Sequence, residues 1–268
     1  MMHGAFDSAG GRMPDANVKS APTREHWLVG SALVFVVILC WSWIIPMAVD
    51  MYGRMTGAAA WMMTANWDRL HVVLLFSMWS AMMVAMMLPS AAPAILQYAR
   101  DVPIESATTR PTFSISAFAA GYVFVWTLFS AAATIVQLVM SEARLLTPMM
   151  EPAMPALAGG LLLGVGAYQL LPFKRKCLSS CRSPAACTDR RRTGVVGAFR
   201  IGMQHGLSCL GCCGGLMLLL FAGGVMNLSV IAALTLIVLF EKVAAFGMRS
   251  TLVSGGLLIG LGLWIIAR

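Results

Sequence analysis

The chain has 268 residues, of which 59% are hydrophobic and 11% are charged, and its formal net charge is +8. A soluble domain of this length needs more polar surface than this composition supplies. The composition therefore excludes a soluble globular protein and predicts an integral membrane protein.

Seven largely uncharged stretches are long enough to cross about 30 Å of hydrocarbon as helices. In chain order they are residues 28–48, 71–98, 113–140, 154–172, 196–223, 226–246 and 251–267. The last is short, so the helix count at the C-terminus stays open. Strands of a membrane barrel would alternate over about ten residues, which these continuous runs do not. We predict an all-α, polytopic transmembrane helical bundle of about seven helices.

The polar residues 1–27 lack the apolar core and cleavage site of a secretory signal. We expect them to form a flexible cytoplasmic tail before a single transmembrane domain at 28–268. With seven helices, 15 of the 19 Lys and Arg residues lie on the side of the N-terminus. Basic loops stay in the cytoplasm, so the N-terminus is predicted to be cytoplasmic. The lipid bilayer accounts for the net charge, and no nucleic-acid partner is expected.

A basic loop is predicted at 173–195, between the fourth and fifth stretches. It carries Cys177 and Cys181, spaced four residues apart among Lys and Arg residues. Reduced thiols beside cationic groups form thiolates readily and are good metal ligands. We expect a cytoplasmic thiol pair that accepts or donates metal, the alternative being an inert or palmitoylated pair.

The fifth stretch contains HGLSCLGCCGG at residues 205–215. On an ideal helix with His205 at zero, Cys209 lies at roughly 40°, Cys213 at roughly 80° and Cys212 at roughly 340°. All four side chains therefore share one face. The helical rise separates His205 from Cys213 by roughly 12 Å, too far to share one ion in an unbroken helix.

Thiolates and imidazole are costly in low dielectric unless a cation offsets their charge. Soft thiolate ligands favour Cu(I), and a closed tetrahedral Cys/His set would suit Zn(II). Cys209, Cys212 and Cys213 are the predicted core ligands, with His205 alongside. Closing the site requires atoms from another helix or a break at the glycines. The alternatives are a thiol redox role and simple packing of small residues.

Methionines form a stripe in the second stretch, at Met82, Met83, Met86 and Met87, before Pro89. Thioethers hold Cu(I) where cysteine would be oxidised. We interpret the stripe as a weaker relay site, although methionine is also an ordinary core residue. Glu241 and Lys242 follow in the sixth stretch, where pairing or snorkelling to the interface is expected.

The segments 78–93, 167–184, 205–228 and 240–243 together resemble an uncharacterised bacterial family of predicted metal-binding integral membrane proteins. Its most specific signature is HGxxCxGCC, retained here from His205 to Cys213. The resemblance implies a multi-pass protein of the bacterial inner membrane that binds a metal. It names neither the metal nor a direction of transport.

The sequence contains no phosphate-binding loop, no acidic magnesium motif and no Ser/His/Asp arrangement, so we do not expect an enzyme. The predicted function is binding of a soft transition metal, Cu(I) before Zn(II), in its transport or delivery. A membrane thiol-redox protein and a non-catalytic subunit or assembly factor are the alternatives. Expected partners are a metallochaperone, membrane-complex subunits or a second copy, since glycine pairs such as Gly160 and Gly164 suit helix association.

Overall fold

The computed structural model describes residues 24–53, 68–101, 111–182, 194–243 and 247–268. These residues fold into helices joined by short turns, with one isolated bridge between Leu146 and Pro152. The helices are α1 (Arg24–Met51), α3 (Arg69–Asp101), α4 (Pro111–Glu142), α5 (Pro155–Leu170), α6 (Pro172–Arg182), α7 (Gly194–Leu218), α8 (Leu220–Gly223), α9 (Leu228–Val243) and α10 (Gly247–Ala267).

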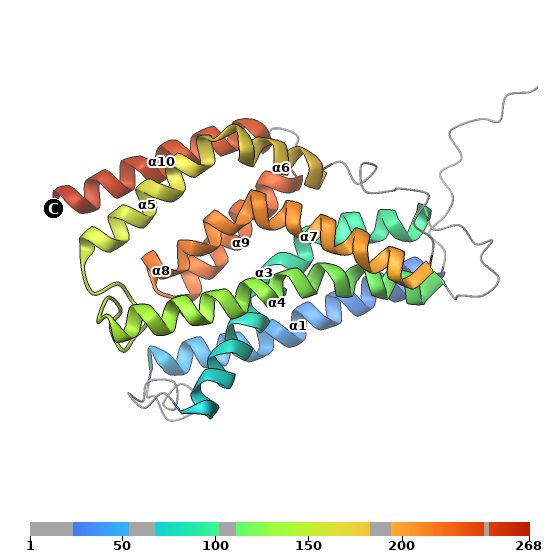
Figure 1. The fold of residues 1–268 in the computed structure, drawn as a ribbon, viewed down its shortest axis with the longest axis horizontal. Coiled ribbons are helices and arrows are strands. Elements are labelled where there is room, and N and C mark those ends of the chain that lie inside the picture. The colour runs from blue at the N-terminus through green and yellow to red at the C-terminus, as the bar shows by residue number, and fades with distance from the viewer. Residues whose placement is uncertain (1–23, 54–67, 102–110, 183–193, 244–246) are drawn as a thin grey trace, which may run out of the picture.

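A helix lies over each of the seven predicted stretches, which confirms an all-helical fold for the described residues (Figure 1). Within the described residues, five helical segments are long and apolar enough to cross a membrane, or six if the bent pair α5 and α6 counts as one span. With 16 residues, α9 is shorter than these. The predicted count of about seven is therefore roughly matched.

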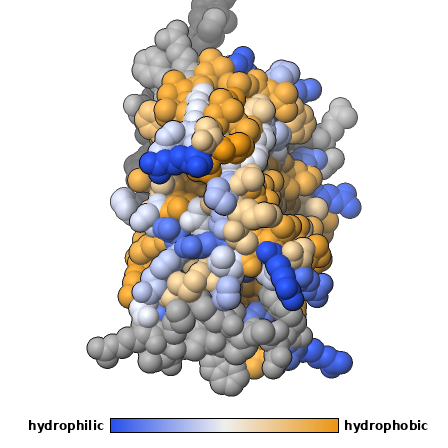
Figure 2. Space-filling model, turned by 90° about the vertical axis from the view of Figure 1, so that its left-hand side faces the viewer, coloured by the Kyte–Doolittle hydropathy of each residue, from blue (hydrophilic) through white to orange (hydrophobic). Residues whose placement is uncertain are grey.

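The outer surface of the bundle is apolar along its length. Exposed side chains include Phe35 on α1, Ile135 on α4, Leu236 on α9 and Leu257 on α10. Hydrophobic residues likewise form much of the flanks in Figure 2. Apolar patches this extensive are rare on soluble monomers and mark contact with a membrane or another protein.

Glycines allow the two long helices α4 and α7 to pack closely along their length. A Cβ at Gly202 of α7 would collide with the backbone carbonyl of Phe118 on α4, and one at Gly121 of α4 would collide with that of Phe199 on α7. The contact is therefore reciprocal and involves backbone atoms. It fixes the helix that carries the cysteines against α4.

A sharp bend separates α5 from α6. Leu171 is extended (ψ 141°) and Pro172 begins α6, which turns away from α5 by 66°. The ring of Pro172 disfavours the helical conformation of the preceding residue, Leu171, so the chain turns here. Because α6 is a helix packed on α7, residues 172–182 are not the loop that we predicted for 173–195; residues 183–193 lie outside the described part. Similarly, α1 begins at Arg24, within the predicted tail.

Candidate metal centre

Three thiols meet on the buried face of α7. Cys209, Cys212 and Cys213 are all buried, and their sulfur atoms lie within 4.8 Å of one another. The Sγ atoms of Cys212 and Cys213 are 3.2 Å apart. Cysteine sulfur binds soft ions such as Zn(II) or Cu(I) at about 2.3 Å, so two sulfur ligands of one ion can be up to about 4.6 Å apart. The three thiols thus fit one ion with small side-chain adjustments.

A fourth thiol reaches this cluster from α6. The Sγ of Cys181 lies 3.6 Å from that of Cys212. Gly211 makes the approach of α6 possible, because a Cβ there would lie 2.7 Å from the Sγ of Cys177. The predicted thiol pair of Cys177 and Cys181 is therefore not separate from the three thiols of α7. Helix α6 brings the pair against the same face of α7.

A partly buried lysine from α9, Lys242, lies beside the thiols. The Nζ of Lys242 donates to the Sγ of Cys209 at 2.9 Å and to the hydroxyl of Ser90 at 2.9 Å. The hydroxyl of Tyr122 on α4 lies 3.1 Å from the same sulfur and 3.1 Å from the carbonyl of Met87. Atoms from α3, α4, α6 and α9 thus surround a site whose helix α7 continues unbroken to Leu218.

An ion pair next to Lys242 holds α6 in position. Lys174 of α6 donates to Glu241 of α9 at 2.7 Å, and both side chains are at most 1% exposed. Gln169 of α5 and Ser254 of α10 donate to the same carboxylate at 3.2 and 3.0 Å. We expected Glu241, beside Lys242, to pair or to reach the interface. It does pair, but its partner is Lys174 of α6.

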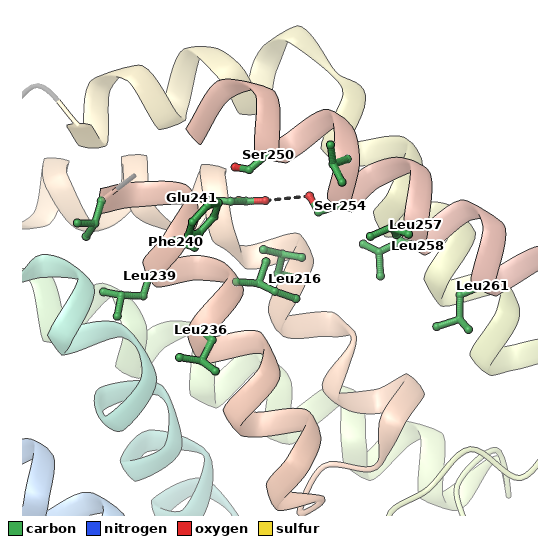
Figure 3. Close-up of a pocket in the computed structure, with 13 residues that line it drawn as sticks. Leu216, Leu236, Leu239, Phe240, Glu241, Ser250, Ser254, Leu257, Leu258 and Leu261 are labelled. Atoms are coloured by element: carbon green, nitrogen blue, oxygen red, sulfur yellow. Dashed lines mark hydrogen bonds between the residues drawn. The ribbon is translucent and has the colours of Figure 1, made fainter. Parts of the chain in front are cut away.

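An apolar cavity of about 960 Å³ lies between α9 and α10, with Glu241 and Ser254 at one end (Figure 3). Leucines such as Leu236, Leu257 and Leu261 line the rest of it. Among the residues that the structure describes, its lining includes no cysteine, so it is distinct from the thiol cluster.

His205 lies one turn before Cys209 and outside the group of three thiols. Its ring is buried, with its centroid 5.7 Å from that of Tyr122 and 6.0 Å from that of Phe118. Its Nδ1 has no hydrogen-bond partner among the described residues. A buried, unpartnered imidazole nitrogen is unusual, and it leaves one ligand atom available near the cluster.

The methionine stripe lies in the core of the bundle. Met82, Met83, Met86 and Met87 of α3 are all buried. The stripe meets the cysteine site through the backbone carbonyl of Met87, which accepts from Tyr122. Burial is equally compatible with packing, so the relay role of these thioethers stays a prediction.

A family model described as PpoB2, copper chaperone, matches residues 76–265. The chain belongs to this copper chaperone family. No curated protein and no solved structure shows a significant match to it. The family assignment supports the coarser part of the predicted function, which is copper handling, and it points to a binding role rather than an enzymatic one. The buried cysteine cluster lies inside the matched residues and is able to bind a metal.

Sequence reasoning found the cysteines of the cluster but missed the groups around them. Lys242, Tyr122 and Ser90 come from three other helices, and no spacing rule connects them to Cys209. One signal was present: Glu241 and Lys242 are charged residues inside an apolar segment, and such residues mark functional or paired sites. Their true neighbours become visible only when α6 and α7 are packed together.

Proposed function

We propose that the chain is an integral membrane protein that binds Cu(I) and takes part in its transport or delivery. Cys209, Cys212 and Cys213 are the core ligands. The observation that carries the proposal is the convergence of three buried sulfur atoms within 4.8 Å in a member of a copper chaperone family. Copper is the cargo of this site.

Membrane insertion is supported by the surface of the bundle. In the part of the chain that the structure describes, five helical segments have the length and hydropathy needed to span a bilayer, and large apolar side chains are exposed along them. Lipid tails would cover these side chains, which water would not solvate favourably. We infer the bacterial inner membrane, with a cytoplasmic N-terminus, from the distribution of Lys and Arg.

The charge around the cluster supports a thiolate–metal centre. A Cu(I) ion bound by three thiolates carries a net negative charge, which is unfavourable in a buried site. The ammonium of Lys242, 2.9 Å from the Sγ of Cys209, offsets part of that charge. The hydroxyl of Tyr122 offers the same sulfur a further hydrogen bond. Soft thiolate ligands select Cu(I), and Zn(II) is the competing ion.

The remaining predicted ligands suit a route toward and away from this centre. Cys181, 3.6 Å from Cys212, is the first acceptor or donor, and Cys177 follows one turn earlier on α6. His205 offers a nitrogen ligand beside Cys209. The buried thioethers Met82, Met83, Met86 and Met87 form the weaker relay. A metallochaperone or a membrane-complex subunit would exchange copper with α6.

The test is metal analysis of protein purified in detergent without oxygen. Wild type is expected to retain about one or two equivalents of copper after exposure to Cu(I) and removal of the excess. The variant with Cys209→Ser, Cys212→Ser and Cys213→Ser should lose the tightly bound equivalent. Cys40→Ser is the matched control, because Cys40 is a partly buried thiol in α1 and should leave the stoichiometry unchanged.

Equal copper content in the triple variant and wild type would contradict the proposal. A thiol-redox role is the second candidate, because the Sγ atoms of Cys212 and Cys213 lie 3.2 Å apart. In that case a quinone would take two electrons and two protons from the two thiols of the metal-free protein, leaving a disulfide, and thioredoxin would reduce that disulfide back to two thiols. Retention of Zn(II) in place of copper would keep the site but change its cargo.

A further inference from the structure

Several methionines lie at the end of the bundle where α1 finishes, which is opposite to the end where α4 and α7 begin. Here the end of α1, the segment 143–154 and the turn 224–227 come together, on the left in Figure 1. Figure 2 views this end directly, and hydrophilic residues interrupt the apolar surface there. These three segments are far apart in the chain, so their meeting is a feature of the fold.

Hydrogen bonds interlock the three segments. The amide of Val225 donates to the carbonyl of Met150 at 3.3 Å. The hydroxyl of Tyr52, which follows α1, donates to the carboxylate of Glu151 at 2.9 Å. A Cβ at Gly224 would lie 3.2 Å from the Cγ of Glu151 and 3.3 Å from the hydroxyl of Tyr52. The three segments of the chain therefore converge within a few ångströms.

Each of the three segments places a buried methionine directly beside its contact residue. Met51 precedes Tyr52, Met150 precedes Glu151 and Met226 follows Val225, and their exposed fractions are 0%, 5% and 0%. This burial is notable for residues at the ends of helices and in turns, where side chains are usually accessible.

The backbone of Met150 adds an independent observation. Its φ is +58°, in the left-handed region that is unfavourable for an L-residue and is normally occupied by glycine or asparagine. Strained residues of this kind cluster at functional sites. The Met150 side chain is nonetheless buried, and a glycine at this position would relieve the strain but supply no ligand.

We propose that Met51, Met150 and Met226 form a second soft-metal site that takes Cu(I). Three thioethers suit a monovalent soft ion and remain ligands in an oxidising compartment, where thiols would form disulfides. Cys213 and Gly224 are separated by a largely helical segment of about 16 Å, so one ion cannot serve both sites. The methionine site is thus the port at this end of the bundle, and the cysteine site lies deeper.

The experiment uses Ag(I), a redox-inert analogue of Cu(I), on protein that lacks the cysteine site. The starting protein carries the three serine substitutions described above and is treated with N-ethylmaleimide to block the remaining thiols. It is expected to retain Ag(I) through its methionines. Adding Met51→Leu, Met150→Leu and Met226→Leu should remove one equivalent, because leucine has nearly the same volume but no ligand atom.

Met203→Leu is the matched control, since Met203 is partly buried at the other end of α7 and should leave silver binding unchanged. No retained Ag(I) in the thiol-blocked protein, or equal retention with and without the three leucines, would overturn the proposal. The result is independent of the cysteine centre, because that centre is absent from every sample. Unchanged helical circular dichroism in the leucine variant shows that a loss reflects the missing ligands.

Discussion

Breaking the buried ion pair between Lys174 and Glu241 is expected to destabilise the protein and release α6 from α7. The change is Glu241→Gln, which preserves the shape of the side chain and removes its charge. Lys174 is 0% exposed, so its ammonium would remain buried with only an amide as partner. The predicted consequence is loss of the contact that holds Cys181 against the cysteine cluster of α7.

The structure sets the size of the effect. Removing one partner of a fully buried pair costs about 3–5 kcal/mol. The remaining amide oxygen still accepts a hydrogen bond, so we expect the lower end, about 3 kcal/mol. For a chain of this length, that corresponds to a fall of roughly 6–12 °C in apparent Tm. The double variant Lys174→Met with Glu241→Leu removes both charges and should melt within a few degrees of wild type.

Two measurements check this prediction in detergent-solubilised protein. Thermal unfolding gives the change in Tm, and mass spectrometry after maleimide treatment gives the labelling rate of Cys181, which should rise in Glu241→Gln. Glu142→Gln is the control, because that carboxylate is exposed at the end of α4 and its loss should change stability by less than about 0.5 kcal/mol. Wild-type Tm and labelling in Glu241→Gln, or a double variant as unstable as the single one, would refute the reasoning.

Three further predictions follow from other contacts. Lys242→Met should weaken Cu(I) binding about 1,000-fold in a competition titration, because unit charges 4 Å apart attract by ~4 kcal/mol at an effective dielectric of 20. Unchanged affinity would exclude the charge-offset role. Gly202→Ala should lower Tm by several degrees through a clash with the α4 backbone, whereas Gly160→Ala, which meets nothing within 4 Å, should not. Burial and Glu151 raise the pKa of Tyr52 to about 12. The stability that the protonated phenol contributes is therefore complete below pH 10 and is lost as the pH rises toward 12. Glu151→Gln should move the phenolate absorbance transition of Tyr52 to lower pH.

Much of the architecture could be predicted from hydropathy, because an apolar segment of membrane length satisfies its backbone hydrogen bonds only as a helix. The helical face shared by Cys209, Cys212 and Cys213 was also predictable, since helix periodicity alone determines it. These features depend on residues within one segment. They require no knowledge of how the segments pack.

The environment of the site could not be predicted in the same way. The basic residues near Cys177 suggested a solvated loop, but Lys174 finds a buried carboxylate on α9, and this contact folds α6 onto the bundle. Lys242 reaches Cys209 across 33 positions of sequence. The Lys174 contact comes from α6, which follows the 66° bend after α5, and no local pattern beyond Pro172 specifies that bend. The glycine pairs were only partly informative: Gly202 is packed, whereas Gly160 is uncovered.

The central claim is that Cu(I) is bound by the cluster of sulfur atoms on α7. X-ray absorption at the copper edge of anaerobically loaded protein tests it most directly, because the oxidation state and the ligand atoms are read together. The account predicts a Cu(I) edge and a first shell of about three sulfur atoms at about 2.3 Å. A Cu(II) edge, or a shell made of nitrogen and oxygen atoms, would contradict it.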